Sequence, residues 1–276
     1  MAEKLSDTNF EKLAEFIYRK AGIYLEVSKH YAKIDNLVSK RITDGDFADF
    51  RKYFFKLRFE DHDGEEFQAL MNGVTVNETY FFREETQLDA LSTVLIPKLH
   101  QIRPKREPLR ILSAPSSTGE EPYSMIIKIL EEENVIGERD IEVVGIDIDS
   151  TVIDKAKAGK YSDRSIHAIP QTLVSKYFKK SGMWNQFSPD LCGAVEFRVV
   201  NIFDKVQVRQ LGKFDVIFSR NMLIYFDDAS RKEVAMTFYD LLKPDGYVLL
   251  GHAEYMSRIV SVFKAQKVLD TLVYQK

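Results

Sequence analysis

Two adjacent glutamates, Glu120 and Glu121, follow Gly119 in the segment SAPSSTGEEP, residues 113–122. Apolar runs flank this segment, in the pattern of a strand, a turn and a helix. In nucleotide-binding α/β proteins such a turn carries several glycines, because the backbone must approach a phosphate. Two carboxylates in this turn would repel a phosphate, so the turn suits a ligand end that is uncharged or cationic. Alternatively, the glutamates favour the dipole of the following helix, and each can serve one role.

Polar residues also follow the next two apolar runs. Asp147 ends the second run, in VVGIDIDS, and lies 28 residues after Gly119. An acid at this position can accept hydrogen bonds from both ribose hydroxyls of an adenosine. Dinucleotide-binding folds place such an acid about 20 residues after the glycines of the first turn. Its alternative role is to cap a helix, for which Asp149 is better placed. Asn201, after the third run, can pair with an adenine edge or close a turn.

The two observations together restrict the ligand. A ribose acid indicates an adenosine, whereas the acidic first turn indicates that its other end carries no phosphate. S-adenosylmethionine meets both conditions, because it has no phosphate and carries a sulfonium and an amino group. Glu121, or Glu120, is placed to attract that positive end.

The elements that position these residues fall into two halves. Residues 1–85 are predicted to form an all-helical domain. Its first helix ends near Gly22, and three more span 29–42, 47–58 and 65–74. One face of the first helix is apolar and consists of Phe10, Leu13, Ala14, Ile17 and Ala21. Residues 86–107 are predicted to form a helix and basic linker. From 108 to 276 helical patterns alternate with the apolar runs Leu109–Ala114, Ile141–Ile146, Val195–Val200, Phe214–Ser219 and Tyr247–Gly251. Such alternation indicates a parallel sheet. A small β insertion is expected near 180–195, where Gly and Pro interrupt the pattern.

Composition excludes several classes of protein. The chain has 276 residues and a net charge of −3, so it has no overall attraction to nucleic acid or an anionic membrane. The single cysteine, Cys192, excludes an internal disulfide. No apolar run approaches the roughly 18 residues of a membrane span, and the N-terminus lacks a signal-peptide core. We therefore expect a cytoplasmic protein, a monomer, with no metal, since spacings such as CxxC and HExxH are absent.

Five segments in order carry a resemblance to a known family: NETYFFRE (77–84), SAPSSTGEEPYS, DIDSTVIDKAKAGKY, FSRNMLIYF and LLKPDGYVLLGHAE. Together they resemble the CheR-type glutamate O-methyltransferases of bacterial chemoreceptors, over nearly the whole chain. The resemblance implies an α/β fold: an S-adenosylmethionine-dependent methyltransferase (Rossmann-like) sheet with helices on both faces, behind a small all-α domain.

The resemblance also implies roles for individual residues. Those expected to bind S-adenosylmethionine are Asn77, Thr79, Arg83, Glu121, Asp147, Asn201, Ile202, Asn221 and Met222. Arg83 and Tyr225 are expected beside the transferring methyl, as catalytic residues. At least two of the bulky residues Tyr80, Phe81 and Phe82 are expected to be core. The acceptor glutamate is already ionised at pH 7, so no general base is required. The products are a glutamyl methyl ester and S-adenosylhomocysteine.

Two regions are candidates for contact with the chemoreceptor. A loosely basic face on the second helix, Lys29, Lys33, Lys40 and Arg41, is expected to meet the acidic methylation region of the receptor, unless it is simply a solvated helix face. Some family members hold a receptor C-terminal pentapeptide with the β insertion. Here the insertion is short and has few basic residues after Lys180, so we expect no use of that tether. Trp184 and Phe187 are expected to form the core of the hairpin; the alternative is a patch that contacts a partner.

Three other functions are disfavoured. A nicotinamide-dependent oxidoreductase would need the GxGxxG pattern, which is absent. A nucleic-acid methyltransferase would carry an NPPY-type motif after the fourth strand, where this chain has RNMLIY, and a basic groove. A non-catalytic S-adenosylmethionine-binding adaptor would have lost the residues facing the methyl group, whereas Arg83 and Tyr225 are both present.

Overall fold

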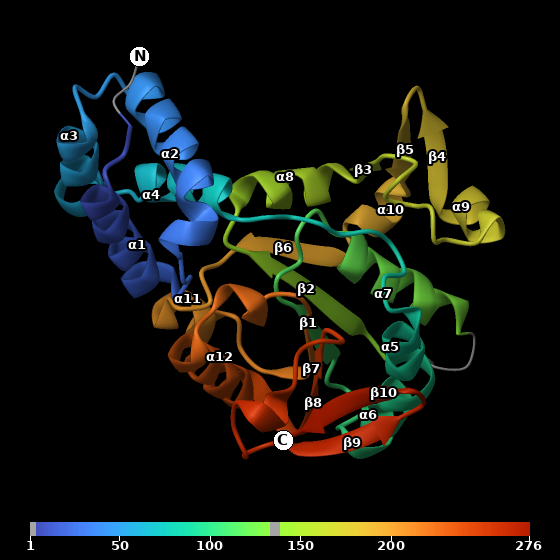
Figure 1. The fold of residues 1–276 in the computed structure, drawn as a ribbon. Helices are drawn as coiled ribbons and strands as arrows, with labels where there is room; N and C mark the ends of the chain where they lie inside the picture. Colours follow the sequence, from blue (N-terminus) through green and yellow to red (C-terminus); the bar gives the residue numbers. More distant parts are fainter. Residues whose placement is uncertain (1–3, 133–138) are drawn as a thin grey trace.

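A computed structural model describes residues 4–132 and 139–276 of the chain. Its centre is a seven-stranded sheet with the order β6-β2-β1-β7-β8-β10-β9 (Figure 1). The strands are β1 Leu109–Ser113, β2 Ile141–Asp147, β6 Val195–Val199, β7 Phe214–Ser219, β8 Leu242–Leu250, β9 Lys264–Val268 and β10 Thr271–Gln275. The first five named are parallel and match the five predicted strands, whereas β10 runs antiparallel to both of its neighbours.

Helices cover both faces of this sheet, as predicted. The apolar residues of α7 (Glu120–Glu131) and α8 (Ser150–Ala158) belong to the core on one face. Those of α11 (Lys205–Gln210) and α12 (Asp228–Leu241) belong to the core on the other. Strand β7 is buried at all six positions, as expected for a parallel strand covered on both sides. The chain order along the sheet reverses between β1 and β7, and ligands of open α/β sheets bind at such a point.

The segment predicted as a linker is a continuous helical stretch, α5 (Glu85–Ala90), η2 (Leu91–Leu95) and α6 (Ile96–Ile102). Its apolar side chains are buried in the same core as α7: Leu88, Leu91, Leu95, Ile96 and Leu99. The stretch therefore packs against one face of the sheet as part of its core.

The N-terminal residues are helical, with α1 Asp7–Ala21, α2 Val27–Asp44, α3 Phe50–Phe55, η1 Lys56–Glu60 and α4 Glu65–Val74. Ser6 caps the start of α1 with its side chain, and Gly22 ends it in the left-handed conformation at φ 68°. The predicted apolar face of α1 is buried except for the partly exposed Ala14. This face joins the core that also contains α12, so the N-terminal helices pack directly on the catalytic half.

A second, three-stranded antiparallel sheet has the order β3-β5-β4. Its strands are β3 Lys160–Tyr161, β4 Phe178–Ser181 and β5 Trp184–Phe187, and the short helices α9 (Gln171–Tyr177) and α10 (Pro189–Cys192) flank the hairpin. Phe187 is fully buried against Phe81 and Tyr123, but Trp184 is 44% exposed, so the expectation that both form the hairpin core is wrong for Trp184. A tryptophan beside the two-residue turn has too little chain around it to cover it.

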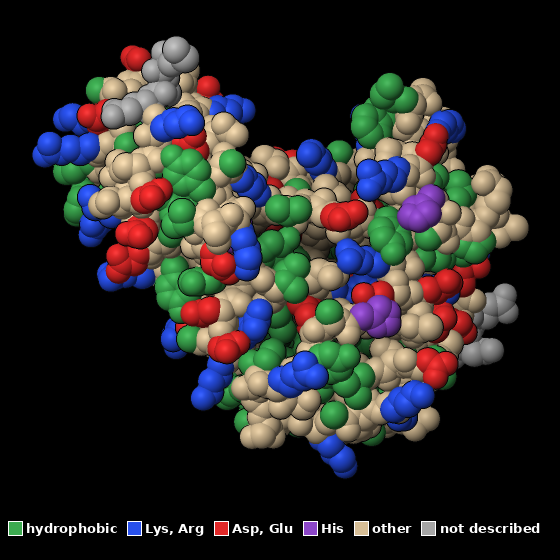
Figure 2. Space-filling view, in the orientation of Figure 1, with side chains coloured by type: hydrophobic (Ala, Val, Ile, Leu, Met, Phe, Trp, Pro, Cys, Tyr) green, Lys and Arg blue, Asp and Glu red, His purple; other side chains and the backbone are tan. Residues whose placement is uncertain are grey.

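The N-terminal helices and the small sheet stand as two lobes above the same edge of the large sheet (Figure 1). The space-filling view shows the surface hollowed between these lobes (Figure 2). Within the described parts of the chain, each helix is too short or too polar to serve as a membrane span.

Candidate functional site

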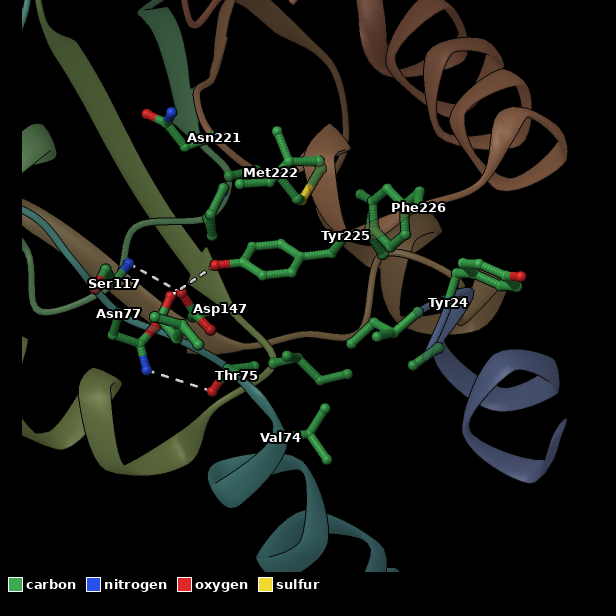
Figure 3. A pocket seen from close by; sticks show the side chains of 18 of the residues that line it. Tyr24, Val74, Thr75, Asn77, Ser117, Asp147, Asn221, Met222, Tyr225 and Phe226 are labelled. Carbon is green, nitrogen blue, oxygen red and sulfur yellow. Dashed lines mark hydrogen bonds between the residues drawn. The ribbon is translucent and has the colours of Figure 1, made fainter. Parts of the chain in front are cut away.

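A cavity of about 830 Å³ opens at the carboxyl ends of β1, β2 and β7. This size is typical of sites for a ligand as large as a nucleoside derivative. Its wall includes every residue predicted to bind the methyl donor or to act in catalysis: Asn77, Thr79, Arg83, Glu121, Asp147, Asn201, Ile202, Asn221, Met222 and Tyr225. Figure 3 shows several of them converging from separate elements. The structure therefore brings together residues that are up to about 150 positions apart in sequence, as between Asn77 and Tyr225.

Asp147 lies at the end of β2 and is 4% exposed. Its carboxylate accepts hydrogen bonds from the backbone N–H of Ser117, at 2.9 Å, and of Asp149, at 3.0 Å. Burial raises the pKa of Asp147 to about 6, although the backbone donors oppose the rise. Asp149 caps α8 by accepting from the N–H of Thr151 and Val152, as predicted, so Asp147 is free of that role.

The two glutamates of the first turn face different ways. Glu121 lines the cavity, where its carboxylate accepts a hydrogen bond from Ser113 Oγ at 2.7 Å. Glu120 accepts from Thr118 Oγ1 at 2.6 Å instead, and burial raises its pKa. Gly119 before them has φ 93°, and a Cβ there would lie 3.0 Å from Ala156 and from the Tyr161 hydroxyl. Of the two, Glu121 alone lines the cavity. This agrees with the expectation that one glutamate faces the ligand and the other serves the helix.

Arg220 is a residue of the cavity wall that the sequence analysis did not select. It is 7% exposed, and its guanidinium pairs with the Glu121 carboxylate and donates to the Arg83 carbonyl at 2.6 Å. Glu84 lies 3.9 Å away. The residue follows β7 directly, in SRNMLIYF, so its place at a strand end was the signal available in the sequence. A cationic ligand end near Glu121 would share that carboxylate with Arg220.

Asn221 and Met222 continue the loop after β7. Asn221 adopts the left-handed conformation, φ 58°, and Figure 3 shows it and Asp147 on opposite sides of the Tyr225 ring. The amide oxygen of Asn221 is buried and has no hydrogen-bond partner among the described residues. The hydroxyls of Ser116 and Ser117, also in the wall, lack described partners in the same way. Buried polar atoms without partners are costly, so these atoms are suited to receive a polar ligand.

The segment 77–84 forms one side of the cavity. Asn77 donates to the Asp149 carboxylate at 3.0 Å, and Arg83 donates to the Glu78 carbonyl at 3.0 Å. Arg83 lies between two residues with positive φ, Phe82 at 59° and Glu84 at 53°. Residues other than glycine adopt this backbone region rarely. Surrounding contacts must therefore hold Phe82 and Glu84 in it, and these two residues fix the position of Arg83 between them. The prediction that at least two of the three aromatic residues are core is confirmed, because Phe81 and Phe82 are buried.

The Tyr225 hydroxyl points across the cavity and donates to the Val76 carbonyl at 3.0 Å (Figure 3). Burial raises the pKa of Tyr225, the nearby Asp147 charge adds to the rise, and Arg83 opposes it. The hydroxyl therefore stays protonated at neutral pH and acts as a hydrogen-bond donor. The backbone of Tyr225 is held from the N-terminal side, because the Tyr24 N–H donates to its carbonyl at 2.9 Å.

Asn201 is placed differently from the adenine-edge interpretation. Its amide nitrogen donates to the Lys20 carbonyl at 2.7 Å, and its amide oxygen accepts from the Phe203 N–H at 3.0 Å. The alternative interpretation, a turn residue after a strand, describes this geometry. The side chain thus joins the end of α1 to the loop after β6, because its amide group bonds to the backbone of both segments. Ile202 beside it is partly buried and lines the cavity.

The four cations predicted on α2 do not form one free basic face. Lys33 donates to the carbonyls of Val74, at 2.6 Å, and Thr75, at 3.0 Å. Arg41 makes a bidentate pair with Glu66, at 2.7 and 2.6 Å. Lys29, exposed but paired with Glu26 at 2.8 Å, and the exposed Lys40 are the members that face solvent. The prediction of a shared surface is wrong for Lys33 and Arg41, because α4 supplies acceptors that the spacing of α2 cannot reveal.

The His, Cys, Asp and Glu side chains of residues 4–132 and 139–276 do not gather into a group of three or more that would hold a metal ion. The groups that line the cavity are instead carboxylates, hydroxyls, amides and backbone donors at the switch point of the sheet.

The fold and this cavity define an α/β methyltransferase that uses S-adenosylmethionine. The family described as CheR methyltransferase, SAM binding domain, matches residues 77–270, and the chain belongs to this family. It is 41% identical to chemotaxis protein methyltransferase 2 of Vibrio cholerae, over 99% of this chain and 94% of that protein. It is 34% identical to the chemotaxis protein methyltransferase of Escherichia coli, over 92% and 87%, and 33% identical to that of Salmonella typhimurium, over 94% and 88%.

Proposed function

We propose that this enzyme methyl-esterifies glutamate side chains on the cytoplasmic helical region of chemoreceptors, for sensory adaptation in chemotaxis. The proposal rests chiefly on one observation. A single cavity is lined by an acid suited to a ribose, Asp147, by an acid suited to a cation, Glu121, and by an arginine suited to a carboxylate, Arg83. The names of the relatives supply the chemotactic setting.

The residues present fit the methyl donor. Asp147 is at the end of β2 for the ribose, and the partnerless oxygens of Ser116, Ser117 and Asn221 offer further hydrogen bonds. When bound, S-adenosylmethionine supplies a methyl group on a sulfonium, and a carboxylate oxygen takes that methyl as the C–S bond breaks and its electron pair stays on sulfur. The acceptor carboxylate is ionised at neutral pH, so the protein need not remove a proton.

The chain's own contribution is alignment and exclusion of water. Opposite charges are lost in this reaction, so tight pairing of the acceptor with Arg83 would stabilise the ground state more than the transition state. Arg83 already donates to the Glu78 carbonyl, and its remaining N–H groups can orient one carboxylate. Tyr225 positions the reacting groups through a hydroxyl that remains protonated. Lys40, and Lys29 when it exchanges its pair with Glu26, are the exposed cations of α2 that an acidic receptor helix can meet.

We also infer that the enzyme works as a cytoplasmic monomer and without a receptor tail tether. The hairpin that would hold such a peptide has a two-residue turn, Gly182 and Met183. Lys180, the last basic residue before that turn, pairs with Asp163 at 2.5 Å, which reduces its availability to a peptide carboxylate.

The function is tested with S-adenosylmethionine labelled in its methyl group and membranes that contain receptor. Label on receptor protein should be released as methanol by mild alkali, and Arg83→Ala should remove most of it. Arg164→Ala is the matched control, because Arg164 is exposed and pairs only loosely, at 3.6 Å, with Glu78 on the same side of the cavity. Alkali-stable label would exclude a glutamyl ester, and absence of label despite donor binding would favour the adaptor function.

A further inference from the structure

The turn after β8, GHAE, ends in a glutamate that the proposed reaction leaves without a role. Glu254 is 8% exposed, and its carboxylate accepts three backbone hydrogen bonds. Oε2 accepts from Gly251, at 2.9 Å, and from Asn221, at 3.0 Å, while Oε1 accepts from Leu223, at 2.8 Å. One side chain therefore joins its own turn to the loop after β7.

These bonds act on the conformation of Asn221. Its backbone is in the left-handed region, φ 58°, which asparagine adopts more readily than other non-glycine residues but still at a steric cost that neighbouring contacts can offset. Glu254 accepts the N–H of Asn221 itself and that of Leu223, two residues on, so the carboxylate fixes the peptide unit before Asn221 and the one after Met222. Space for this arrangement depends on Gly251, because a Cβ there would lie 3.0 Å from Glu254 Oε2 and 3.3 Å from the Asn221 nitrogen.

The Asn221 side chain carries an acceptor that has no described partner. Asn221 lines the cavity, and its amide oxygen is buried without a hydrogen-bond partner among the described residues. It stands across the Tyr225 ring from Asp147, and so away from the predicted ribose position (Figure 3). Glu121, the acid suited to a cation, lines the same cavity and pairs with Arg220, the residue before Asn221. A cationic donor group is the chemistry that fits an amide oxygen without a partner and a carboxylate that belong to the wall of one cavity.

We propose that Glu254 is a positioning residue that holds the Asn221 amide oxygen ready to accept a hydrogen bond from the amino group of the methyl donor. Glu254 does not line the cavity, and it acts through the Asn221 backbone. This inference rests on the proposed binding of the donor in this cavity, and it predicts that Glu254 matters only for ligands that carry the amino-acid end.

The test compares two ligands on the full-length protein by titration calorimetry. S-adenosylhomocysteine carries the amino group, and 5′-methylthioadenosine has the same nucleoside without it. In Glu254→Gln the new amide places a donor against one of the three N–H groups, so the loop is released. The affinity for S-adenosylhomocysteine should fall about tenfold, the effect of one lost hydrogen bond to a charged group, while the affinity for methylthioadenosine should change less than about twofold.

Four further variants separate positioning from general loosening. Asn221→Ala should have the same ligand-selective effect, and the double variant should be no worse than either single one, because both remove the same interaction. Glu120→Gln is the matched control: Glu120 is also a buried glutamate, 2% exposed, but does not line the cavity, so both affinities should be unchanged. If Glu254→Gln does not fold, Gly251→Ala should reproduce the selective loss.

Two results would overturn the proposal. An equal loss for both ligands would mean that Glu254 only supports the fold, and no loss for either would mean that the Asn221 loop is held without it. Failure of the unmodified protein to bind either ligand is a different result, since it would contradict donor binding in this cavity and with it the proposed function.

Discussion

Buried polar groups line the floor of the cavity, whereas exposed apolar side chains lie at its mouth beside the exposed Lys29, Asn77, Glu78 and Asp228. The floor residues Ser117, Glu121 and Asp147 are each less than 10% exposed. The mouth residues Tyr24, Val76 and Ile224 are about half exposed, at 49%, 58% and 56%, although they line the same cavity. The side chains at the mouth are therefore more open to solvent than the polar groups of the floor.

This difference indicates that the site is completed in two stages. The floor is held by backbone hydrogen bonds and can select a small polar ligand without any partner. The mouth presents apolar surface that becomes dry only when an acceptor protein covers it. A reaction that neutralises charge benefits from such drying at the moment of transfer. Changes at the floor should therefore affect donor binding, and changes at the mouth should affect only transfer to receptor.

Removal of the acid at the floor should have the largest effect. In Asp147→Ala two hydrogen bonds between a carboxylate and the ribose are lost, so donor affinity should fall about 100-fold or more, as measured by calorimetry. Asp163→Ala is the control, because Asp163 is an exposed acid paired with Lys180 on the hairpin side. A loss below about threefold would place the ribose elsewhere.

Removal of the Tyr225 hydroxyl tests the boundary between floor and mouth. Tyr225→Phe keeps the ring but deletes the donor to Val76, so the rate of methyl transfer should fall about 30-fold, the effect of one lost hydrogen bond to a charged group. Donor affinity should change less than about threefold. Tyr24→Phe, an exposed tyrosine at the mouth, provides the comparison, and equal rates for both variants would contradict a role for the Tyr225 hydroxyl.

The floor should also be sensitive to acid. The pKa of Asp147 is raised to about 6, so the carboxylate is ionised above that pH and protonated below it. Donor affinity should be constant from pH 8 to 7 and fall about tenfold by pH 5, since the ionised form accepts from both ribose hydroxyls. Calorimetric titrations across this range check the slope, and Asp147→Asn should flatten it. A slope that persists in the variant would assign the titration to another group.

The smallest effect is expected at the mouth. Ile224→Ser replaces an exposed apolar side chain with a hydroxyl, so kcat/KM for receptor should fall about fivefold, in line with loss of a partly buried side chain at an interface. Donor affinity should not change. Val262→Ser is the control, because Val262 is 43% exposed and does not line the cavity. A weakened donor affinity in Ile224→Ser would break the distinction between floor and mouth.

Strand periodicity and strand ends were sufficient to predict much of the fold and of the cavity. Continuous apolar runs gave the five parallel strands, because such strands are buried on both faces. Strands β9 and β10 did not show this signal. Strand β9, KAQKV, is exposed over most of its length, and β10 has exposed or partly exposed positions among its buried ones. Strand β8 begins before its predicted start, and its pairing with β7 is irregular near Phe214 because Pro244 to Gly246 interrupt the apolar run.

Contacts between segments far apart in sequence were out of reach. The pattern of α2 placed Lys33 and Arg41 on a helix face, but it could not show that Val74, Thr75 and Glu66 would satisfy them. Asn201 can likewise pair with an adenine edge or with backbone groups. Its sequence position could not show that its amide donates to the carbonyl of Lys20, 181 positions away. The partner of Glu121, Arg220, required the same three-dimensional information.

The junction after α1 has a consequence for how such enzymes can be recombined. Ile23 pairs with Phe226 in a β-bridge, Tyr24 donates to the Tyr225 carbonyl, and the Tyr18 hydroxyl donates to Asp227 at 3.0 Å. Gly22 packs so closely on Phe203 that a Cβ would lie 2.0 Å from its ring. A chimera that exchanges the N-terminal helices between relatives must therefore take residues 18–24 and 225–227 from the same parent, because the graft boundary passes through the backbone contacts of Tyr225, the tyrosine proposed to act in catalysis.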